Sequence, residues 1–167
     1  MSKDNRTHVT FVTKLFNTTE EKDYFINPTC FGDDLAEWLI KRLNKVDPKP
    51  TQEDWGWCFS VEVGQRGFLV CLGYYEDDDT PSTWLVFIES RLNWFGRKLL
   101  GRSDKTDLLA LSQELDHALN SDPQITHIRW HTKEDFMKGN ENNWLSHPIE
   151  KELYESNLEQ RSHRRKQ

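Results

Sequence analysis

Residues 57–75, WCFSVEVGQRGFLVCLGYY, indicate a β-hairpin to which the neighbouring segments can be added. Over residues 57–63, large apolar side chains alternate with smaller or polar ones, which is typical of a strand with one wetter face. The two glycines of residues 64–67 predict a tight turn. Residues 68–75 are apolar on both faces, so we expect a central strand that is covered on both sides.

Three further segments predict strands of the same sheet. The acidic residues 76–81 indicate a loop, and residues 83–89, TWLVFIE, indicate a strand that returns from it. Residues 8–16 alternate between apolar and polar positions, and residues 125–131 indicate a last strand. Together these segments predict one mostly antiparallel sheet.

Two helices are expected beside the sheet. Over residues 33–46, apolar side chains recur every three or four positions, with acidic residues in the first turn and basic residues in the last turns. A second helix is expected from residue 103 or 104 to about residue 120. Residues 91–102 predict a short amphipathic turn or helix that is interrupted at Gly96. The apolar stripe of each helix must pack against an apolar surface, and one face of the sheet is large enough to provide it. We therefore expect both helices on the same face of the sheet.

The resulting order, β-α-β-β-β-α-β, segregates strands from helices and predicts the α+β class. Residues 1–145 are expected to form a single α+β domain, followed in residues 146–167 by a C-terminal helix from Pro148 and a basic tail. A length of 167 residues agrees with one domain.

Composition and charge restrict the class of protein. Aspartate and glutamate number 28 against 22 lysines and arginines, so the net charge is −6, and it is −10 without the four basic charges of residues 161–167. The start of the chain is polar, and no apolar stretch is long enough to span a bilayer. Cys30, Cys58 and Cys71 have no CxxC spacing and indicate a reducing compartment. We therefore expect a cytoplasmic protein that does not contact a membrane.

The sequence predicts no catalytic residue, no metal site and no cofactor; catalysis is left open, with a non-enzyme favoured. No Gly-x-Ser-x-Gly elbow, P-loop, Gly-x-Gly-x-x-Gly or His-Glu-x-x-His motif is present. Cys58 and Cys71 lie in apolar strands, where a thiol is a small core residue. Glu76, Asp77 and Asp78 do not have EF-hand spacing, which favours a solvated loop over a cation site.

Histidine and arginine alternate on the last predicted strand. His127, Arg129 and His131 share one face there. The two histidines lie about 13 Å apart along a strand, so they cannot hold one metal ion together. Either histidine is suited to act as a general base or a pH switch, and an exposed polar strand face explains them more simply.

The most distinctive string is EDWGW, residues 53–57. Trp55 and Trp57 fall on the same side if the strand begins there, and Gly56 permits a close approach of backbone or ligand. Tryptophan is enriched at binding hot spots but also fills cores. At least four of the seven tryptophans are expected to be structural.

Two basic segments have the composition of a nucleic-acid site. Both segments, residues 91–102 and the tail 161–167, carry arginine and lysine side chains that could contact phosphate groups. The first segment also contains Trp94, whose ring could stack on a base. The acidic remainder of the chain repels a polyanion, so we favour arginines paired with acidic neighbours and expect no nucleic-acid partner.

Three stretches carry a resemblance to known proteins. LAEWLIKRL (35–43), EDWGWCFSVEV (53–63) and LVCLGYYEDD (69–78) resemble small, uncharacterised bacterial α+β proteins, with Trp-Gly-Trp as the best marker. The likeness covers about residues 30–90 and implies no activity. The acidic, tryptophan-rich, single-domain format is also similar to immunity proteins of bacterial toxin systems, although no motif is diagnostic of them.

Two functional hypotheses follow. The first is a non-catalytic protein-interaction module whose acidic, aromatic surface binds a protein partner, with an immunity-type inhibitor of a basic toxin as one form of it. The alternative is a small-ligand-binding protein or enzyme with a pocket between the sheet and residues 91–102. The oligomeric state is not predicted. The residues predicted to bind are Trp55, Trp57, Glu76, Asp77, Asp78, Trp94, Arg129 and His131.

Overall fold

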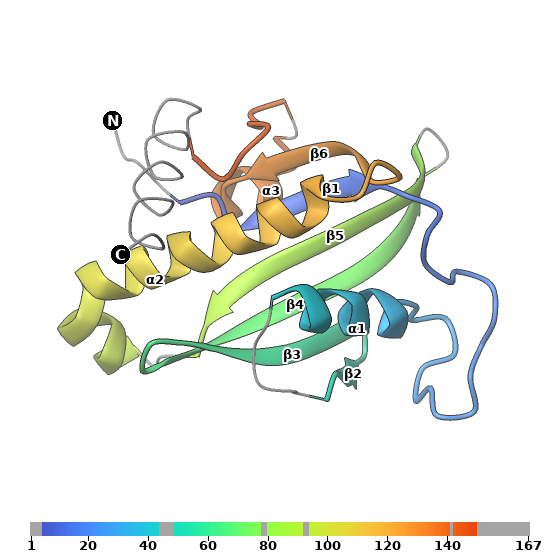
Figure 1. Cartoon of the computed structure of the whole chain (residues 1–167), viewed down its shortest axis with the longest axis horizontal. Coiled ribbons are helices and arrows are strands. Elements are labelled where there is room, and N and C mark those ends of the chain that lie inside the picture. Colours follow the sequence, from blue (N-terminus) through green and yellow to red (C-terminus); the bar gives the residue numbers. More distant parts are fainter. Residues whose placement is uncertain (1–4, 44–48, 78–79, 92–93, 141, 150–167) are drawn as a thin grey trace, which may run out of the picture.

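A computed structural model gives the arrangement of most of the chain (Figure 1). The described residues are 5–43, 49–77, 80–91, 94–140 and 142–149. In chain order the elements are β1 (His8–Val12), α1 (Asp33–Arg42), β2 (Thr51–Glu53), β3 (Gly56–Val63), β4 (Arg66–Asp77), β5 (Thr80–Ser90), α2 (Trp94–Asn120), β6 (Thr126–His131) and α3 (Lys133–Met137). The predicted C-terminal helix and basic tail fall almost wholly in residues 150–167, outside the described residues.

The six strands form one sheet in the order β2-β3-β4-β5-β1-β6, and each neighbouring pair is antiparallel. In the hairpin of β3 and β4, Trp57 pairs with Leu72 and Val63 pairs with Arg66. β1 lies between β5 and β6, so the first and last strands of the described residues are neighbours. The prediction of an α+β protein with a single antiparallel sheet is confirmed.

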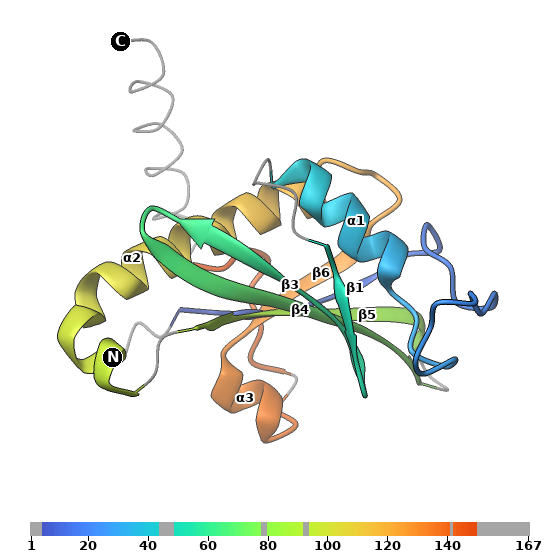
Figure 2. The same cartoon turned by 90° about the horizontal axis from the view of Figure 1, so that it is seen from below.

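One face of the sheet carries the hydrophobic core beneath α1 and α2 (Figure 2). Alternate strand residues point to this face, among them the fully buried Trp84 and Trp130. Leucines at helical spacing pack against them, and those with no exposed surface are Leu35, Leu39, Leu111, Leu115 and Leu119. Among the described residues, no helix combines the length and the hydrophobicity that crossing a membrane requires.

Three elements differ from the sequence-based expectation. β2 is an additional edge strand that pairs with β3 across the turn at residues 54–55. α2 is continuous from Trp94, so the predicted break at Gly96 is wrong. α3 lies in the polar stretch after β6, where no helix was expected, and Thr132 caps it, with its Oγ1 accepting a hydrogen bond from the amide of Asp135 at 3.1 Å.

The acidic run belongs to a longer hairpin than expected. β4 extends to Asp77 and β5 begins at Thr80, and these two residues pair with each other. The prediction of a loop over residues 76–81 is wrong because the β4–β5 ladder continues past its last apolar pair. β1, by contrast, ends at Val12 rather than residue 16.

Cys58 and Cys71 are bonded to each other as a disulfide. They lie directly opposite on β3 and β4, with 4.2 Å between their Cα atoms. The interpretation of both as free core thiols is therefore wrong, because it considered each strand without its register. Cys30 is a free cysteine of intermediate exposure.

Reducing the Cys58–Cys71 disulfide is expected to lower the free energy of unfolding by about 2–3 kcal/mol, because the bond closes a loop between residues 13 positions apart. Urea unfolding with and without a thiol reductant measures this loss, in Cys30→Ser to prevent disulfide exchange. The same protein with Cys58→Ala and Cys71→Ala is the control and is expected to be insensitive to reductant. Equal stability of the oxidised and reduced proteins would contradict the expectation.

Candidate functional site

The face of the sheet opposite α1 and α2 is here called the open face, and α3 lies on this side (Figure 2). Successive strand pairings bring one residue of each strand into a single row across it. From β2 to β6 the row is Thr51, Cys58, Cys71, Phe87, His8 and His131. These residues come from distant parts of the chain, so the sheet topology builds the row.

Aromatic rings form a continuous stack on the open face. Trp55 packs on Phe87 with 5.3 Å between ring centroids and 25° between planes, and Phe87 stacks on His8 at 5.1 Å and 9°. Phe136 of α3 then contacts His8 at 5.2 Å and His131 at 5.9 Å. Of these five residues Trp55 is the exposed one, with 50% of its surface accessible.

Two glycines allow Trp55 to lie against the sheet. A Cβ on Gly56 would be 2.1 Å from the carbonyl oxygen of Leu72 and 3.3 Å from the Cα of Gly73. A Cβ on Gly73 would be 3.2 Å from the carbonyl oxygen of Trp55. A side chain at either position would push the turn away from β4. The Trp-Gly-Trp string is therefore the point where the chain folds over the open face.

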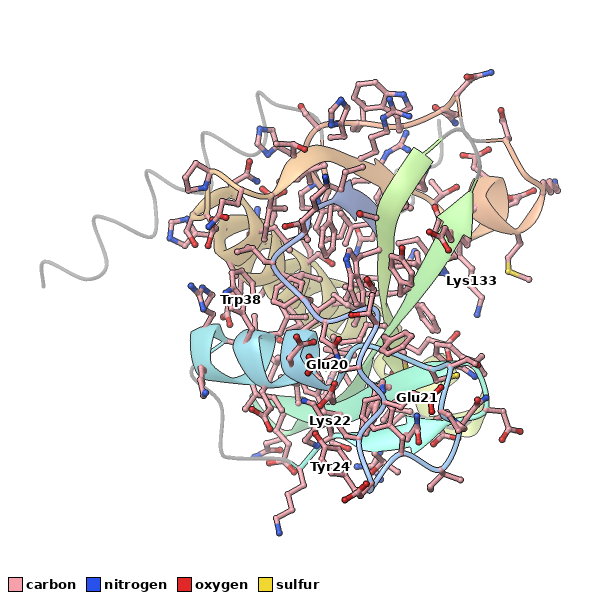
Figure 3. All side chains as sticks on the ribbon, turned by 90° about the vertical axis from the view of Figure 1, so that its right-hand side faces the viewer. Glu20, Glu21, Lys22, Tyr24, Trp38 and Lys133 are labelled. Atoms are coloured by element: carbon pink, nitrogen blue, oxygen red, sulfur yellow. A yellow bond between two sulfur atoms is a disulfide. The ribbon has the colours of Figure 1, made fainter. Side chains whose placement is uncertain are left out.

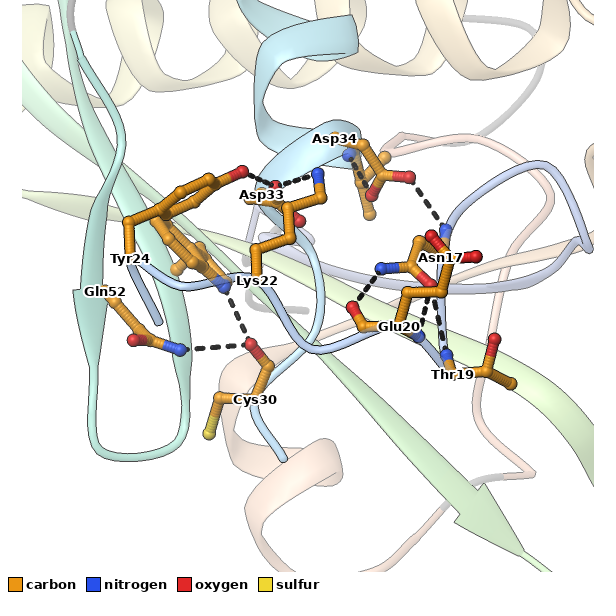
Figure 4. A network of polar contacts seen from close by, with 11 residues as sticks. Asn17, Thr19, Glu20, Lys22, Tyr24, Cys30, Asp33, Asp34 and Gln52 are labelled. Carbon is orange, nitrogen blue, oxygen red and sulfur yellow. Dashed lines mark hydrogen bonds and ion pairs between the residues drawn. The ribbon is translucent and has the colours of Figure 1, made fainter. Parts of the chain in front are cut away.

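The loop that precedes α1 holds this turn in place. Asn27 Nδ2 and Cys30 Sγ donate to the carbonyl oxygen of Asp54, at 3.0 and 3.3 Å. Gln52 Nε2 donates to the carbonyl oxygen of Asn27 at 2.9 Å and to that of Cys30 at 3.1 Å, and Figure 4 shows the contact with Cys30. Trp57 Nε1 donates to the carbonyl oxygen of Cys30 at 2.9 Å. Both strands of the β2–β3 hairpin are thus tied to one loop.

A buried carboxylate fixes the same loop to the start of α1 (Figure 4). Asp33 accepts hydrogen bonds from Lys22 Nζ at 2.5 Å and from the Tyr24 hydroxyl. Burial by itself raises the pKa of Asp33, but the two donors outweigh burial and the pKa lies below its ordinary value. Asp34 accepts from the amide of Asn17 at 2.7 Å. These bonds give the turn a rigid support.

His8 and His131 are buried and uncharged at neutral pH. Burial is the main cause that lowers the pKa of His8 to about 4; Lys133 and His131 act in the same direction and Glu89 opposes them. Burial also lowers the pKa of His131. A threonine hydroxyl lies 3.0 Å from Nδ1 of His8, and another lies 3.1 Å from Nε2 of His131. The two rings act as packing groups.

The two tryptophans that the sequence placed on one side lie on opposite faces. Trp57 is 4% exposed and belongs to the core, whereas Trp55 lies on the open face. The expectation that they share a side is wrong because β3 begins at Gly56 and Trp55 belongs to the turn. Trp94 is the first residue of α2, and its side chain lies outside the described part of the structure.

The charged residues predicted to bind are spread over the molecule. Glu76 is exposed near the end of β4, and the side chain of Asp77 and the whole of Asp78 lie outside the described residues. Arg129 is half-buried on the open face, with its guanidinium 5.1 Å from the ring centroid of Trp144. His131, on the same strand, is 2% exposed.

The residues named for a small-ligand pocket do not come together. Gly73, which lies beneath Trp55, is separated from Arg129 by three strand spacings, or roughly 14 Å. Trp57 faces the opposite side of the sheet. The side chains of residues 94–104 lie outside the described part, so the other wall of that pocket is not placed.

Sequence reasoning missed Phe87, His8 and Phe136, which order the ring of Trp55. Their contacts depend on strand pairing over long distances in the chain, and local alternation does not encode it. One local signal was available, because Gly73 interrupts an apolar strand and a glycine inside a strand indicates close approach.

A second buried polar cluster joins α2 to the end of the described chain. Asp116 is fully buried; Trp130 Nε1 donates to it at 2.7 Å, and Nδ1 of His147 lies 2.9 Å from its other oxygen. Leu145 pairs with Trp130 as an isolated bridge. These contacts hold residues 142–149 against the core, and we assign the cluster this structural role.

Neither a metal site nor a known relative identifies the function. Within the described residues, no group of three or more His, Cys, Asp or Glu side chains is placed to hold a metal ion. Comparison of the chain with protein-family models, curated proteins and solved structures found no match. The resemblance noted for residues 30–90 stays a prediction, and the function is argued from geometry.

Gly56→Ala is expected to lower the free energy of unfolding by about 3 kcal/mol or more, because the added Cβ would meet a backbone oxygen that cannot move without distorting β4. Urea unfolding measures the loss. Gly64→Ala is the matched control: nothing lies within 4 Å of its Cβ position, and its φ of 63° costs about 1 kcal/mol. Equal losses in the two variants would disprove the close approach at Gly56.

His8→Phe is expected to reduce the acid sensitivity of the fold. The pKa of His8 is about 4 in the folded protein and 6.5 for the free side chain. The neutral ring therefore makes its full contribution to the free energy of unfolding only above pH 6.5. This contribution declines as the pH falls from 6.5 toward 4. Between these limits wild type should lose about 3 kcal/mol more than the variant, measured by urea unfolding. Parallel losses would show that His8 is protonated in the fold.

Proposed function

We propose that the chain is a non-catalytic protein-interaction module that binds a protein partner through the open face. The observation that carries this proposal is the ring of Trp55, which is half exposed and yet held flat by Phe87 and Gly73. The exposed Tyr75 on β4 shares this face with Cys71 by strand alternation, and α3, which carries the exposed Met137, lies on the same side of the sheet (Figure 2).

A fixed and exposed tryptophan is well suited to binding. Tryptophan is enriched among the residues that dominate binding free energies. Because Phe87 and the turn already order the ring of Trp55, little conformational entropy is lost when a partner covers it. The small-ligand alternative has less support, since Trp55, Trp57 and Arg129 do not share a site.

Charge favours a basic partner. The net charge of −6 would speed association with a basic protein, as complementary charge does in general. An immunity-type inhibitor of a basic toxin is one form of such a module, and the acidic, tryptophan-rich format supports it. The proposal keeps the cytoplasmic location expected from the sequence, although the Cys58–Cys71 disulfide is a feature more common in oxidising compartments and removes the cysteine argument for that location.

Trp55→Ala is expected to weaken partner binding at least tenfold, because it removes a hot-spot ring. The tagged chain would capture partners from a lysate of the source organism, with washes of rising salt, and mass spectrometry would quantify them. Trp144→Ala is the matched control: Trp144 is 42% exposed, but Arg129 lies over its ring, and it makes no described ring contact with the stack. A partner retained equally by both variants would place the interaction elsewhere.

A further inference from the structure

We infer that the partner places an arginine side chain on the exposed face of Trp55, next to the carboxylates of Glu53 and Asp54. This inference rests on the proposed function and specifies the partner's chemistry as a basic protein segment with an exposed arginine. It is carried by three observations: how the chain covers its other tryptophans, how the ring of Trp55 is oriented, and where unpaired negative charge lies.

The chain covers its other partly exposed tryptophans with its own arginines. The guanidinium of Arg42 lies 3.7 Å from the ring centroid of Trp38 on α1 (Figure 3), and that of Arg129 lies 5.1 Å from the ring centroid of Trp144. Among the tryptophans whose side chains are described, these two and Trp55 reach the surface. Trp55 is the most exposed of the three, and within the described residues no cation lies over its ring.

The orientation of the ring leaves one face of Trp55 available. Its inner face packs on Phe87, and the backbone at Gly73 lies below it, so the exposed half of the residue is the outer face. A guanidinium within about 6 Å of a tryptophan centroid is attracted by the negative face of the ring. The ring is already held in place, so the partner's arginine does not have to order it.

Two acidic residues directly precede Trp55 in the chain. Glu53 pairs with Gly56 on β2, and Asp54 precedes Trp55 in the turn; both acidic residues are exposed. Neither carboxylate forms an ion pair or a hydrogen bond with another residue in the described part of the chain. A cation that reaches Trp55 therefore finds negative charge that no described residue neutralises.

More acidic residues lie on the loop before α1, whose Asn27 and Cys30 contact the turn that carries Trp55. Glu20 and Glu21 are exposed on the loop before α1, at the right-hand end of Figure 1 and toward the viewer in Figure 3. The neighbouring cation, Lys22, is engaged by the buried Asp33 and does not offset them. The surroundings of Trp55 thus favour a cationic partner over a neutral or acidic one.

Arginine fits this arrangement better than lysine does. The planar guanidinium stacks on an aromatic ring and donates in a fork to carboxylates, whereas the lysine ammonium is a compact and strongly hydrated charge. Stacking on Trp55 and hydrogen bonding to Glu53 or Asp54 at the same time needs a planar, multidentate donor. Arg42 on Trp38 shows the stacked contact within this same fold.

The test is a titration of the whole chain at low salt with two blocked octapeptides, one of arginine and one of lysine. NMR follows the indole Nε1–H signals, and the Trp55 signal is identified by its loss in Trp55→Leu. We expect the arginine peptide to shift the Trp55 signal and to bind several-fold more tightly than the lysine peptide. Trp55→Leu should weaken the arginine peptide about three- to thirty-fold and remove its advantage over lysine.

Charge variants at carboxylates that form no described hydrogen bond or ion pair give a second readout. Glu53→Gln combined with Asp54→Asn should weaken both peptides, whereas Glu37→Gln, which removes an exposed carboxylate from α1, should leave the Trp55 signal and both affinities nearly unchanged. Equal binding of the two peptides, or arginine binding that survives Trp55→Leu, would overturn the inference.

The lysate experiment separates this inference from the proposed function. A captured partner that depends on Trp55 but is not displaced by the arginine octapeptide would support the interaction module and overturn the arginine contact. Arginine-selective binding at Trp55 with no Trp55-dependent partner in the lysate would support the arginine contact and count against the module.

Discussion

The open face depends on the contact between two backbones where Gly56 and Gly73 lie side by side. Because neither residue has a Cβ, the turn at residues 54–55 can fold down onto β4 and bring Trp55 to Phe87. The stack then continues to His8, across strands from the middle and the beginning of the chain. From the other side, hydrogen bonds to the carbonyl of Asp54 connect the turn to the loop before α1.

The two faces of the sheet use the same residue types for different purposes. Trp84 and Trp130 are fully buried on the helix-covered face, where their size fills the core between strands and leucines. On the open face the ring of Trp55 is ordered without being covered. Carboxylates divide in the same way: Asp33 is buried and paired with Lys22, whereas Glu53 is exposed and forms no ion pair within the described residues.

Periodicity was sufficient to predict the hairpin of residues 57–75 and the apolar stripe of α1, because both depend on neighbours in the sequence. The pairing register between strands could not be predicted from periodicity. The Cys58–Cys71 bond follows from which residues face each other across β3 and β4. Trp55 was assigned to the wrong face because β3 begins at Gly56, so Trp55 lies in the turn, where the alternation of a strand does not set the side of a residue. The stack on Phe87 further requires pairings between distant strands.

The position of β1 has a consequence for how the chain reaches its native state. β2 to β5 form successive hairpins that close short loops, whereas β1, which precedes them in the sequence, is an interior strand that pairs with β5 and β6 far along the chain. Contacts of such high contact order form slowly, because a long loop must close before they stabilise the fold. Until β1 is inserted, β5 is an unpaired edge, and it is the place where a newly made chain is most exposed to pairing with another copy.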